Sequence, residues 1–526
     1  MRVEMRDGLE FLYADSEVGT KPQRSLTVDV GRGGTASVHL LLNDLRAGAP
    51  VRLALRLRGR AVREAEWSRL VDVPVERNTG PVGFVEKEGE RNEFVARRAP
   101  FRVCDAMEPV SPPVRATGAT MALRLQVPVP PDIRPGGREY LLEVGADQER
   151  QEFAFTVNVH KAVIPAVGRG SLPYTNWFSL GQLADRHGLK PWSPGHWRMV
   201  RRYADLMAHG RQNTFWVPLA TIFRVRGKRP VLDRERLRQI VRTFTQAGMH
   251  YIEGGHFGSR TGGRWEATTL DTSLTRTHAI SAEGHEEVAQ VGRQLMEEID
   301  RQGWRGRWLQ HVADEPTAGI AAEYRMLVGM VRKYMPGVPI LDATMEQSIV
   351  GTVDIWCPQV QEYQKHRQWF AGRQAAGDRV WFYTCCFPGG PWLNRLLDME
   401  LLRPALFGWG AALYGLEGFL HWGLNHYGRG QDPFQQSVVG HGQGNFLPAG
   451  DTHIVYPGAG GPWSSLRLEA QREGFEDYEL LRALGERDRA LASRIARKAL
   501  RRFDLYTKDV RVFRSARRAL FSGVNA

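Results

Sequence analysis

Cysteine is scarce in this chain, with four residues among 526. Cys104 and Cys357 stand alone, and Cys385 is directly followed by Cys386, so none has the CxxC spacing of a zinc site or a redox motif. The pattern indicates neither a disulfide framework nor a structural metal site. We therefore expect no metal and no cofactor.

Long apolar runs are also missing. No stretch of 18 apolar residues occurs, and the opening residues MRVEMRDGLEF lack the apolar core of a signal peptide. Read as it stands, the sequence predicts a cytoplasmic protein in a reducing compartment, without a membrane span. A secreted or periplasmic location would require that a signal peptide had been removed. The pattern gives no indication of the oligomeric state.

Lysine is rare as well: nine of the 71 basic residues are lysine, and arginine carries the net charge of +13. The arginines alternate with acidic residues along the chain and are densest from Arg487 to Arg518. No recognition helix, zinc finger or aromatic RNA-binding motif accompanies them. We therefore expect a solvated, salt-bridged surface and no nucleic-acid partner.

The first 165 residues are rich in strand patterns separated by glycine and proline turns. Alternating or apolar runs lie at 25–30, 36–42, 51–57, 119–129, 139–144 and 153–165. Helical periodicity is weak throughout this part. A β-sandwich is the natural way to bury such strands, so we predict an N-terminal β-sandwich domain at 1–165.

From about residue 170 strand patterns alternate with helical ones. The strand candidates lie at 171–178, 213–219, 251–257, 307–313, 339–344, 353–359, 380–386 and 418–424. The clearest amphipathic helices are at 194–210, 234–248 and 321–337, and each ends on a glycine. Eight strand–helix units over this length predict an α/β fold, a (β/α)8 TIM barrel at 166–490. A doubly wound sheet is the alternative.

The end of the chain has a different character. A glycine- and proline-rich stretch at 425–463 follows the eighth strand, and we expect it to lie over the barrel mouth and to be mobile. A helix is predicted at 465–485. Residues 491–526 are predicted to form a C-terminal helical extension packed on the barrel.

Two adjacent acids carry the strongest chemical signal. In HVADEP (311–316) an apolar strand runs into Asp314 and Glu315, which the barrel prediction places at the catalytic face, and Pro316 is expected to open the next helix. Neighbouring carboxylates repel one another, so one keeps its proton to higher pH. Such an acid can protonate the leaving oxygen in glycosidic cleavage. The alternative is that the pair caps the following helix.

These residues give the chain a family resemblance. DEP (314–316), NTFWVPL (213–219), YPG (456–458) and SSLRLEAQREGFEDYELLRAL (464–484) resemble glycoside hydrolase family 123, whose characterised members are β-N-acetylgalactosaminidases. The resemblance covers roughly 170–490, and the β-sandwich in front fits the family architecture.

The resemblance implies substrate-assisted catalysis. The 2-acetamido oxygen of the sugar attacks the anomeric carbon, an aspartate holds the amide, and the next glutamate is the general acid/base. These roles fall on Asp314 and Glu315. The seventh strand, VWFYTCC, carries no carboxylate for a protein nucleophile. Glu253 is the best substitute, and we expect it instead to be a hydrogen-bonding partner behind the site.

Several other side chains are candidates for binding sugar, because aromatic faces suit pyranose rings. The strand ends offer Trp177, Trp216, His256, Trp356, Tyr383, Trp422 and Asn425. Core packing is the alternative for each, and we expect about half to face the pocket. Tyr383 could reach the acetamide oxygen, and Trp422 could form the pocket floor. His311 is expected to be a packed or supporting residue, and the charges of REGFEDYELL to be structural.

The sequence thus favours a retaining exo-β-N-acetylgalactosaminidase or hexosaminidase that acts on an oligosaccharide or glycoconjugate. Two alternatives stay open. One is a glycosidase of other sugar specificity on the same barrel, retaining or inverting. The other is a non-catalytic carbohydrate-binding protein.

Overall fold

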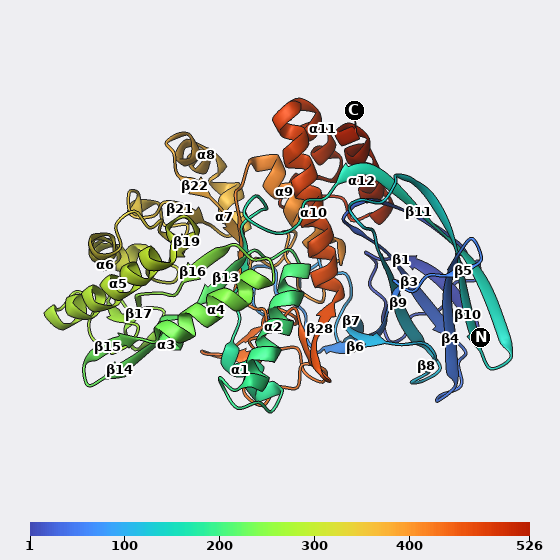
Figure 1. Ribbon diagram of the computed structural model, residues 1–526, viewed down its shortest axis with the longest axis horizontal. Coiled ribbons are helices and arrows are strands. Elements are labelled where there is room, and N and C mark those ends of the chain that lie inside the picture. Colours follow the sequence, from blue (N-terminus) through green and yellow to red (C-terminus); the bar gives the residue numbers. More distant parts are fainter. Residues whose placement is uncertain (526) are drawn as a thin grey trace.

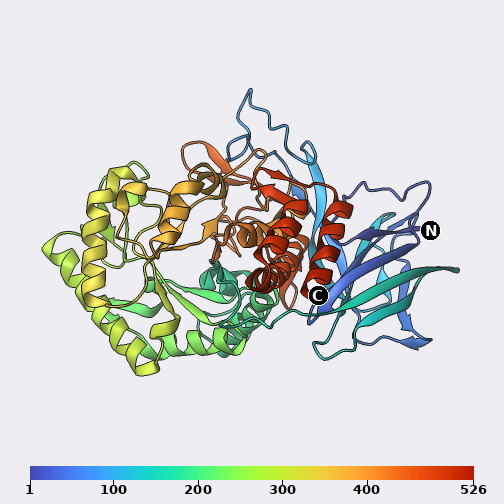
Figure 2. The ribbon, with the colours of Figure 1, turned by 90° about the horizontal axis from the view of Figure 1, so that it is seen from above.

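The computed structural model describes residues 1–525 and shows a mixed α/β fold. Two mostly antiparallel sheets, built mainly from the first 165 residues, lie at one end, and parallel strands with surrounding helices lie at the other (Figure 1). Helices α10 (Leu466–Arg487) and α12 (Val510–Asn525) stand between the two parts, as Figure 2 shows from above. None of the helices within 1–525 is long and apolar enough to cross a membrane.

Two sheets make up the N-terminal part. The larger has the order β1-β3-β9-β6-β7-β28-β27, with bounds Arg2–Asp7, Thr35–Asn43, Met121–Pro128, Glu66–Val75, Phe101–Val110, Gly461–Ser465 and Tyr456–Gly458. The smaller has the order β2-β11-β10-β4-β5, with β8 beside β4; the bounds are Ser25–Arg32, Glu149–Val163, Gly136–Ala146, Pro50–Leu57, Arg60–Ala61 and Val114–Arg115. Inward side chains of both sheets form one apolar core, which includes Leu40, Leu123, Leu142 and Phe155.

All six strand patterns expected in this part correspond to observed strands. Sequence analysis missed the longer strands β1, β6 and β7 and the two-residue strands β5 and β8. In β6, EWSRLVDVPV, charged residues interrupt the apolar alternation, and the ladder to β7 shifts register between Val71 and Asp72. A register shift breaks the period of two on which strand prediction relies.

The second half contains the eight expected strands in parallel pairings. Six of them form the order β19-β16-β13-β12-β24-β23, with bounds Trp308–Gln310, Tyr251–Gly254, Thr214–Val217, Tyr174–Asn176, Phe419–His421 and Phe382–Tyr383. Two more ladders link β20 (Leu341–Ala343), β21 (Ile355–Cys357) and β22 (Arg379–Val380), and the seventh expected strand is divided between β22 and β23. Isolated parallel bridges, Gln310 to Ile340 and Gln359 to Tyr383, join the two sheets. The closed barrel and the sandwich stay predictions, and the mixed α/β class is confirmed.

Helices follow most of these strands. They are α1 (Leu180–Arg186), α2 (Pro194–His209), α3 (Leu219–Ile222), α4 (Arg234–Gln246), α5 (Ala282–Gln302), α6 (Ala321–Tyr334), α7 (Val360–Lys365), α8 (Arg367–Ala375) and α9 (Leu402–Tyr414). The three predicted helices match α2, α4 and α6 within three residues. Between β20 and β21 the described chain has a short 3-10 turn, Gln347–Ile349, in place of an α-helix.

Small hairpins extend the loops at the carboxyl ends of the parallel strands. They pair β14 (Phe223–Arg226) with β15 (Arg229–Leu232), β17 (Gly258–Arg260) with β18 (Leu270–Thr272), and β25 (Val439–His441) with β26 (Asn445–Leu447). The chain ends with α11 (Arg489–Ala499), the pair β29 (Leu500–Arg502) and β30 (Leu505–Tyr506), and α12. α12 packs on both α10 and β11, so the C-terminal segment contacts both halves of the molecule.

The long stretch 425–463 joins the two halves. Its last strand, β28, pairs antiparallel with β7 and so extends the larger N-terminal sheet. Asp105 of β7 and Arg467 of α10 form a fully buried ion pair at 2.9 Å beside this junction. The Arg467 guanidinium also donates to the carbonyls of Gly450 and His453. Strand, helix and loop are thus tied at one point, and much of this stretch is an integral part of the fold.

We predict that Arg467→Leu lowers the free energy of unfolding by about 3–5 kcal/mol, because it leaves the Asp105 charge buried without its partner. The urea midpoint, followed by tryptophan fluorescence, measures the loss. Arg201→Leu is the matched control: Arg201 pairs with Asp205 at 2.7 Å on an exposed helix surface, where such a pair contributes at most about 1 kcal/mol. Similar small losses in both variants would contradict the assignment.

Candidate active site

The carboxylate pair lies directly after β19, at the carboxyl end of the parallel sheet. The Asp314 side chain is exposed to solvent and Glu315 is half-buried. The following 3-10 turn begins at Ala318, after Thr317, and α6 begins at Ala321. Pro316 therefore does not open a helix, which corrects that expectation. Neither acid occupies a helix-capping position, so the capping alternative loses its basis.

Glu315 has a backbone conformation that is uncommon for a residue with a side chain. Its φ is 44°, in the left-handed region that costs a non-glycine residue about 1 kcal/mol or more. Arg260 helps to hold it, because its guanidinium donates to the Glu315 carbonyl at 2.6 Å. The Tyr383 hydroxyl, at the end of β23, donates to Glu315 Oε1. The backbone strain is thus offset by contacts that aim the carboxyl group.

The two acids influence each other's protonation. The pKa of Asp314 is raised, first because protein atoms replace much of the surrounding water and then because the Glu315 charge repels its own. Solvent still reaches one side of Asp314, which limits the first effect. Burial also raises the pKa of Glu315, while Tyr383 and Arg260 oppose that rise. The pair therefore titrates as a unit that keeps one proton to higher pH than an ordinary carboxyl group does.

A buried polar network lies beneath the pair. His311 is fully buried, and its Nε2 contacts Glu253 Oε1 at 2.6 Å while its Nδ1 contacts Asp342 Oδ1 at 2.9 Å. Glu253 also accepts from the Trp177 indole at 2.9 Å and from the Thr175 hydroxyl. The network therefore connects the ends of β12, β16, β19 and β20.

His311 is the cation of this network. Burial alone lowers the pKa of a histidine, but the hydrogen bonds and charges of Asp342 and Glu253 outweigh it and raise the pKa of His311 to about 9. Asp342 in turn accepts from the Tyr324 hydroxyl at 2.5 Å and from the Val312 amide at 3.1 Å. The imidazolium also lies close enough to Asp314 to favour its ionised form.

Glu253 is poorly placed to act as a nucleophile. Its side chain is fully buried and already accepts from three donors. An anomeric carbon would have to displace these partners to reach it. The geometry agrees with the reading of Glu253 as a hydrogen-bonding partner behind the site.

An aromatic wall stands beside this network. Trp177 and Trp216 stack with ring centroids 4.6 Å apart, and His256 packs against both at 5.5 and 5.2 Å. Burial and the charge of His311 hold the pKa of His256 well below its usual range, so its ring is neutral. Within residues 1–525 its Nε2 has no hydrogen-bond partner. Trp216 and His256 therefore lie together next to the network, and their contact with sugar stays a prediction.

Two of the sugar-binding candidates face elsewhere. Trp356 is fully buried in the core outside the sheet, at right angles to Trp369, and its indole donates to Asp378 at 2.8 Å. Asn425 is also fully buried, and its amide exchanges two hydrogen bonds with the backbone of Ser179. Their side chains serve core packing and loop closure, so the expectation that they line the pocket is wrong.

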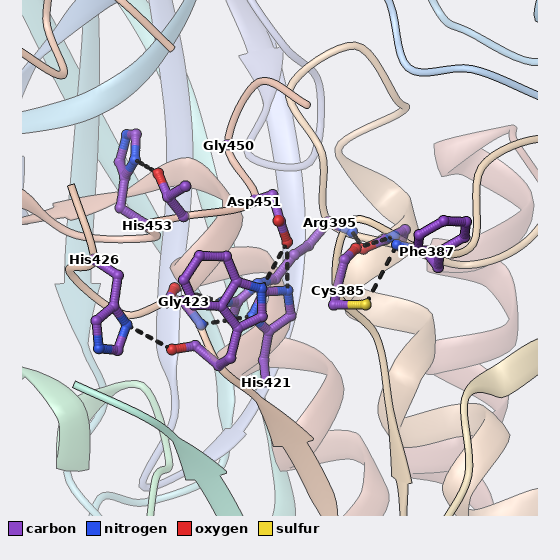
Figure 3. A network of polar contacts seen from close by, with 12 residues as sticks. Cys385, Phe387, Arg395, His421, Gly423, His426, Gly450, Asp451 and His453 are labelled. Carbon is purple, nitrogen blue, oxygen red and sulfur yellow. Dashed lines mark hydrogen bonds and ion pairs between the residues drawn. The ribbon is translucent and has the colours of Figure 1, made fainter. Parts of the chain in front are cut away.

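Trp422 has a different setting, at the end of β24. It is half-buried, stacks on His426, and donates to Asp451 Oδ1 at 3.2 Å. Asp451 is fully buried, and burial raises its pKa to about 7. Figure 3 shows the Asp451 carboxylate facing His421, whose Nε2 lies 3.7 Å from Asp451 Oδ1. Trp422 as the floor of a sugar pocket stays a prediction.

Sequence analysis missed the residues on the outer side of Glu315. A cavity of about 100 Å³ is lined by Trp265, Glu315, Pro316, Thr317, Met345 and Glu346. Trp265 lies in the loop between β17 and β18, which turns at Gly262 and Gly263 with φ of 65° and 66°. The sequence feature that could have identified Trp265 is the SRTGGRW segment after the third strand, where a tryptophan follows a glycine turn in a polar loop.

A metal ion fits this site poorly. The possible ligand atoms of His256, His311 and Asp342 lie within 4.8 Å of one another. Both ring nitrogens of His311 already contact carboxylates, Nε2 that of Glu253 at 2.6 Å and Nδ1 that of Asp342 at 2.9 Å. A metal ion at His311 would have to displace one of these two hydrogen bonds, because a ring nitrogen that binds a metal must offer it a lone pair.

The REGFEDYELL segment forms part of α10 and its charges are paired. Arg472 pairs with Glu469 at 3.1 Å and with Glu476 at 2.6 Å, and Arg517 of α12 pairs with Asp477 at 2.8 Å. All these side chains are buried. The interpretation of this motif as structural agrees with the contacts.

Comparisons with known proteins point to one family. Residues 263–484 match the family model for the catalytic domain of glycoside hydrolase 123. A solved family 123 glycoside hydrolase from Clostridium perfringens, described in terms of glycolipid glycan hydrolysis, shares the fold with a TM-score of 0.76. That likeness has 13% identity and covers 100% of this chain and 97% of that one. A β-D-glucuronidase from Dictyoglomus thermophilum is far less similar, at a TM-score of 0.36, 12% identity, and coverage of 90% and 69%. None of the curated proteins matches.

Residues 263–484 therefore match a catalytic domain of the glycoside hydrolase class. More particularly, this segment matches the model of the glycoside hydrolase family 123 catalytic domain, and the resemblance seen in the sequence is confirmed. Asp314 and Glu315 lie within the matched segment.

We predict that His311 titrates with a midpoint near pH 9, because two carboxylates hold its proton. Nuclear magnetic resonance of the imidazole ring, assigned with His311→Asn, measures it. His426, whose pKa burial lowers to about 4, is the internal control and should be neutral at pH 7. The stabilisation that His311 gains is fully present below pH 6.5 and is lost as the pH rises through 9. The stability gap between wild type and His311→Asn should narrow over that window. A titration midpoint near pH 6.5 would contradict this assignment.

Proposed function

We propose that this protein is a retaining exo-β-N-acetylhexosaminidase, with N-acetylgalactosamine as its sugar, that acts by substrate-assisted catalysis. The observation that carries the proposal is the adjacent pair Asp314 and Glu315 at the carboxyl end of the parallel sheet, inside the family 123 segment. In this reaction the sugar supplies its own nucleophile, and the protein supplies one acid and one amide-holding carboxylate.

The surroundings of the two acids support a division of roles. Glu315 is half-buried with a raised pKa and is aimed by the Tyr383 hydroxyl, which suits a general acid. Asp314 is exposed toward the opening and has the His311 imidazolium behind it. That cation favours the ionised form of Asp314, which can accept the N–H of the acetamide group. Charge on the developing oxazolinium ring is then stabilised by a carboxylate that is already in place.

The arrangement of the remaining acids also supports a substrate nucleophile. The end of the seventh strand carries Tyr383, Thr384 and Cys385, none of which is a carboxylate. Glu253 is buried and fully engaged with its three donors. A two-carboxylate retaining mechanism would need a carboxylate that is free to reach the anomeric carbon.

The fold contributes to the proposal through its strand order. Parallel ladders and single bridges follow one another from β12 through β24, and β24 pairs with β12 again. We propose that these eight strands form a (β/α)8 barrel in which the site lies at the carboxyl-terminal face. The two N-terminal sheets around their shared core are proposed to be a β-sandwich.

The substrate is proposed to be an oligosaccharide or glycoconjugate. The related Clostridium perfringens enzyme is described in terms of glycolipid glycan hydrolysis. Aryl β-glycosides that differ at C2 and C4 test the assignment. We expect turnover of the 2-acetamido sugars and at least a hundredfold slower turnover of the 2-hydroxy sugars. Equal turnover would give the barrel another sugar specificity, and binding without turnover would make the protein a carbohydrate-binding one.

We predict that Glu315→Gln lowers kcat/KM on natural disaccharides by roughly 10²–10⁴-fold, because the leaving oxygen then has no proton donor. An aryl glycoside with a good leaving group needs little protonation and should lose far less. Initial rates on both substrates provide the measurement. Equal loss on both would remove Glu315 from the role of general acid.

Asp314→Asn is predicted to lower kcat by roughly 10²–10³-fold while the fold persists, because it removes charge but little volume. A stable thiazoline analogue of the oxazolinium ring should inhibit wild type far better than the product sugar does, and much of that advantage should vanish in the variant. Inhibition constants measure both effects. A covalent adduct trapped by a fluorosugar on a protein carboxylate would refute the substrate-assisted route.

A further inference from the structure

Trp265 is a large apolar side chain left in solvent close to the acid pair. Its exposed fraction is 56%, and it is the one tryptophan among the exposed large apolar residues of the described chain. It lines the cavity that also contains Glu315, Pro316 and Met345. An exposed indole beside a reactive group has no packing role that accounts for it, because half of its surface is available to a ligand.

Contacts hold the Trp265 ring in place. The Arg260 guanidinium stacks on the indole at 4.2 Å from the ring centroid. The same guanidinium donates to the Glu315 carbonyl at 2.6 Å, and the Arg260 side chain is largely buried. One cation thus contacts both the aromatic face and the backbone of the acid.

The residues that line this cavity indicate which part of the substrate binds there. A general acid lies next to the glycosidic oxygen, between the sugar that is cleaved off and its leaving group. Asp314, proposed to hold the acetamide group of the cleaved sugar, does not line the cavity, and neither do His311 and Glu253. Glu315 does line it, together with residues of the loops after β16, β19 and β20. The cavity is therefore positioned for the leaving group.

The size and lining of the cavity suit a sugar ring. A volume of about 100 Å³ equals roughly three waters of the liquid, so it takes the inner edge of a ring while the flat face lies on Trp265. Thr317 and Glu346 add polar atoms at the rim. The hairpin β25–β26 reaches the same loop, where Gln443 donates to Glu266 at 2.9 Å. The rim thus combines one aromatic face with several groups able to bind hydroxyls.

We propose that Trp265 forms the leaving-group subsite of this enzyme and stacks on the apolar face of the first pyranose beyond the cleaved bond. This inference rests on the proposed function, because it takes Glu315 as the acid. The subsite makes the protein selective for glycans in which another sugar, and not a small alcohol, follows the terminal residue.

The test compares substrates with and without a ring to stack. Trp265→Ala should lower kcat/KM on a β-linked N-acetylgalactosaminyl disaccharide roughly tenfold, the usual size of an aromatic stacking contribution. It should leave the rate on N-acetylgalactosaminyl fluoride within twofold, because fluoride is too small to reach the indole. Equal losses on both substrates, or none on the disaccharide, would overturn the proposal.

Two matched variants separate this effect from general damage. Trp192 carries a stacked Arg236 at 4.2 Å on another part of the surface, so Trp192→Ala removes the same kind of pair and should spare both substrates. Arg260→Lys loosens Glu315 as well as Trp265 and should slow both substrates together. A selective loss on the disaccharide in Trp192→Ala would also count against the subsite.

A binding measurement keeps the proposal testable whatever the turnover. The disaccharide is titrated into Glu315→Gln and into Glu315→Gln with Trp265→Ala, and the dissociation constants are determined by calorimetry. We expect roughly tenfold weaker binding in the double variant. Equal binding would refute the subsite even if the enzyme is active. Weaker binding with no hydrolysis by wild type would refute the proposed function and leave the sugar-stacking role of Trp265 intact.

Discussion

A positive charge that is shut away from water must be compensated where it lies. His311 meets this requirement with Glu253 on one side and Asp342 on the other, and each carboxylate is held by further donors. Every member is fully buried, so none can turn away without leaving an unpaired charge. The segment that carries the carboxylate pair, His311 to Glu315, begins at this buried histidine. The position of the carboxylate pair therefore depends on an ion network that does not itself need to meet substrate.

The same principle recurs farther from the site. α10 carries Arg467, Arg472 and Asp477 into the interior, and each finds an opposite charge on β7, on its own helix or on α12. The arginines that are in excess in the sequence therefore lie only partly on the surface, and some are buried in ion pairs. Arginine suits these positions because its guanidinium forms several hydrogen bonds and stays charged when buried.

The fold could be inferred from the sequence wherever the hydrophobic periodicity of an element agrees with the glycine or proline residues at its ends. Strands such as β13 and β16 are short apolar runs, and α4 ends near a glycine, so their places follow from local chemistry. Strand β6 was not predicted because charged residues interrupt its alternation of apolar and polar residues. The absence of an α-helix between β20 and β21 within the described chain had no local signal at all, since it depends on how neighbouring helices fill the space.

The site was predictable in the same uneven way. Asp314 and Glu315 stand out as adjacent acids after an apolar strand, and Tyr383 follows from its place at a strand end. Which face a side chain takes is harder to infer: Trp356 alternates outward on a strand where a one-residue difference decides between core and cavity. Arg260 and Trp265 lie in an irregular loop, where the sequence has no periodicity to interpret.

One feature of the architecture bears on how such proteins arise. β27 and β28, which follow the last strand of the catalytic half, complete a sheet begun by the first residues of the chain. A gene fragment that carries either half alone would encode an open sheet edge at β7 or two orphan strands, and open edges invite aggregation. Exchange of the N-terminal half between relatives by recombination is therefore restricted to partners whose edge strands match. The two halves are expected to have diverged together, as one inherited unit.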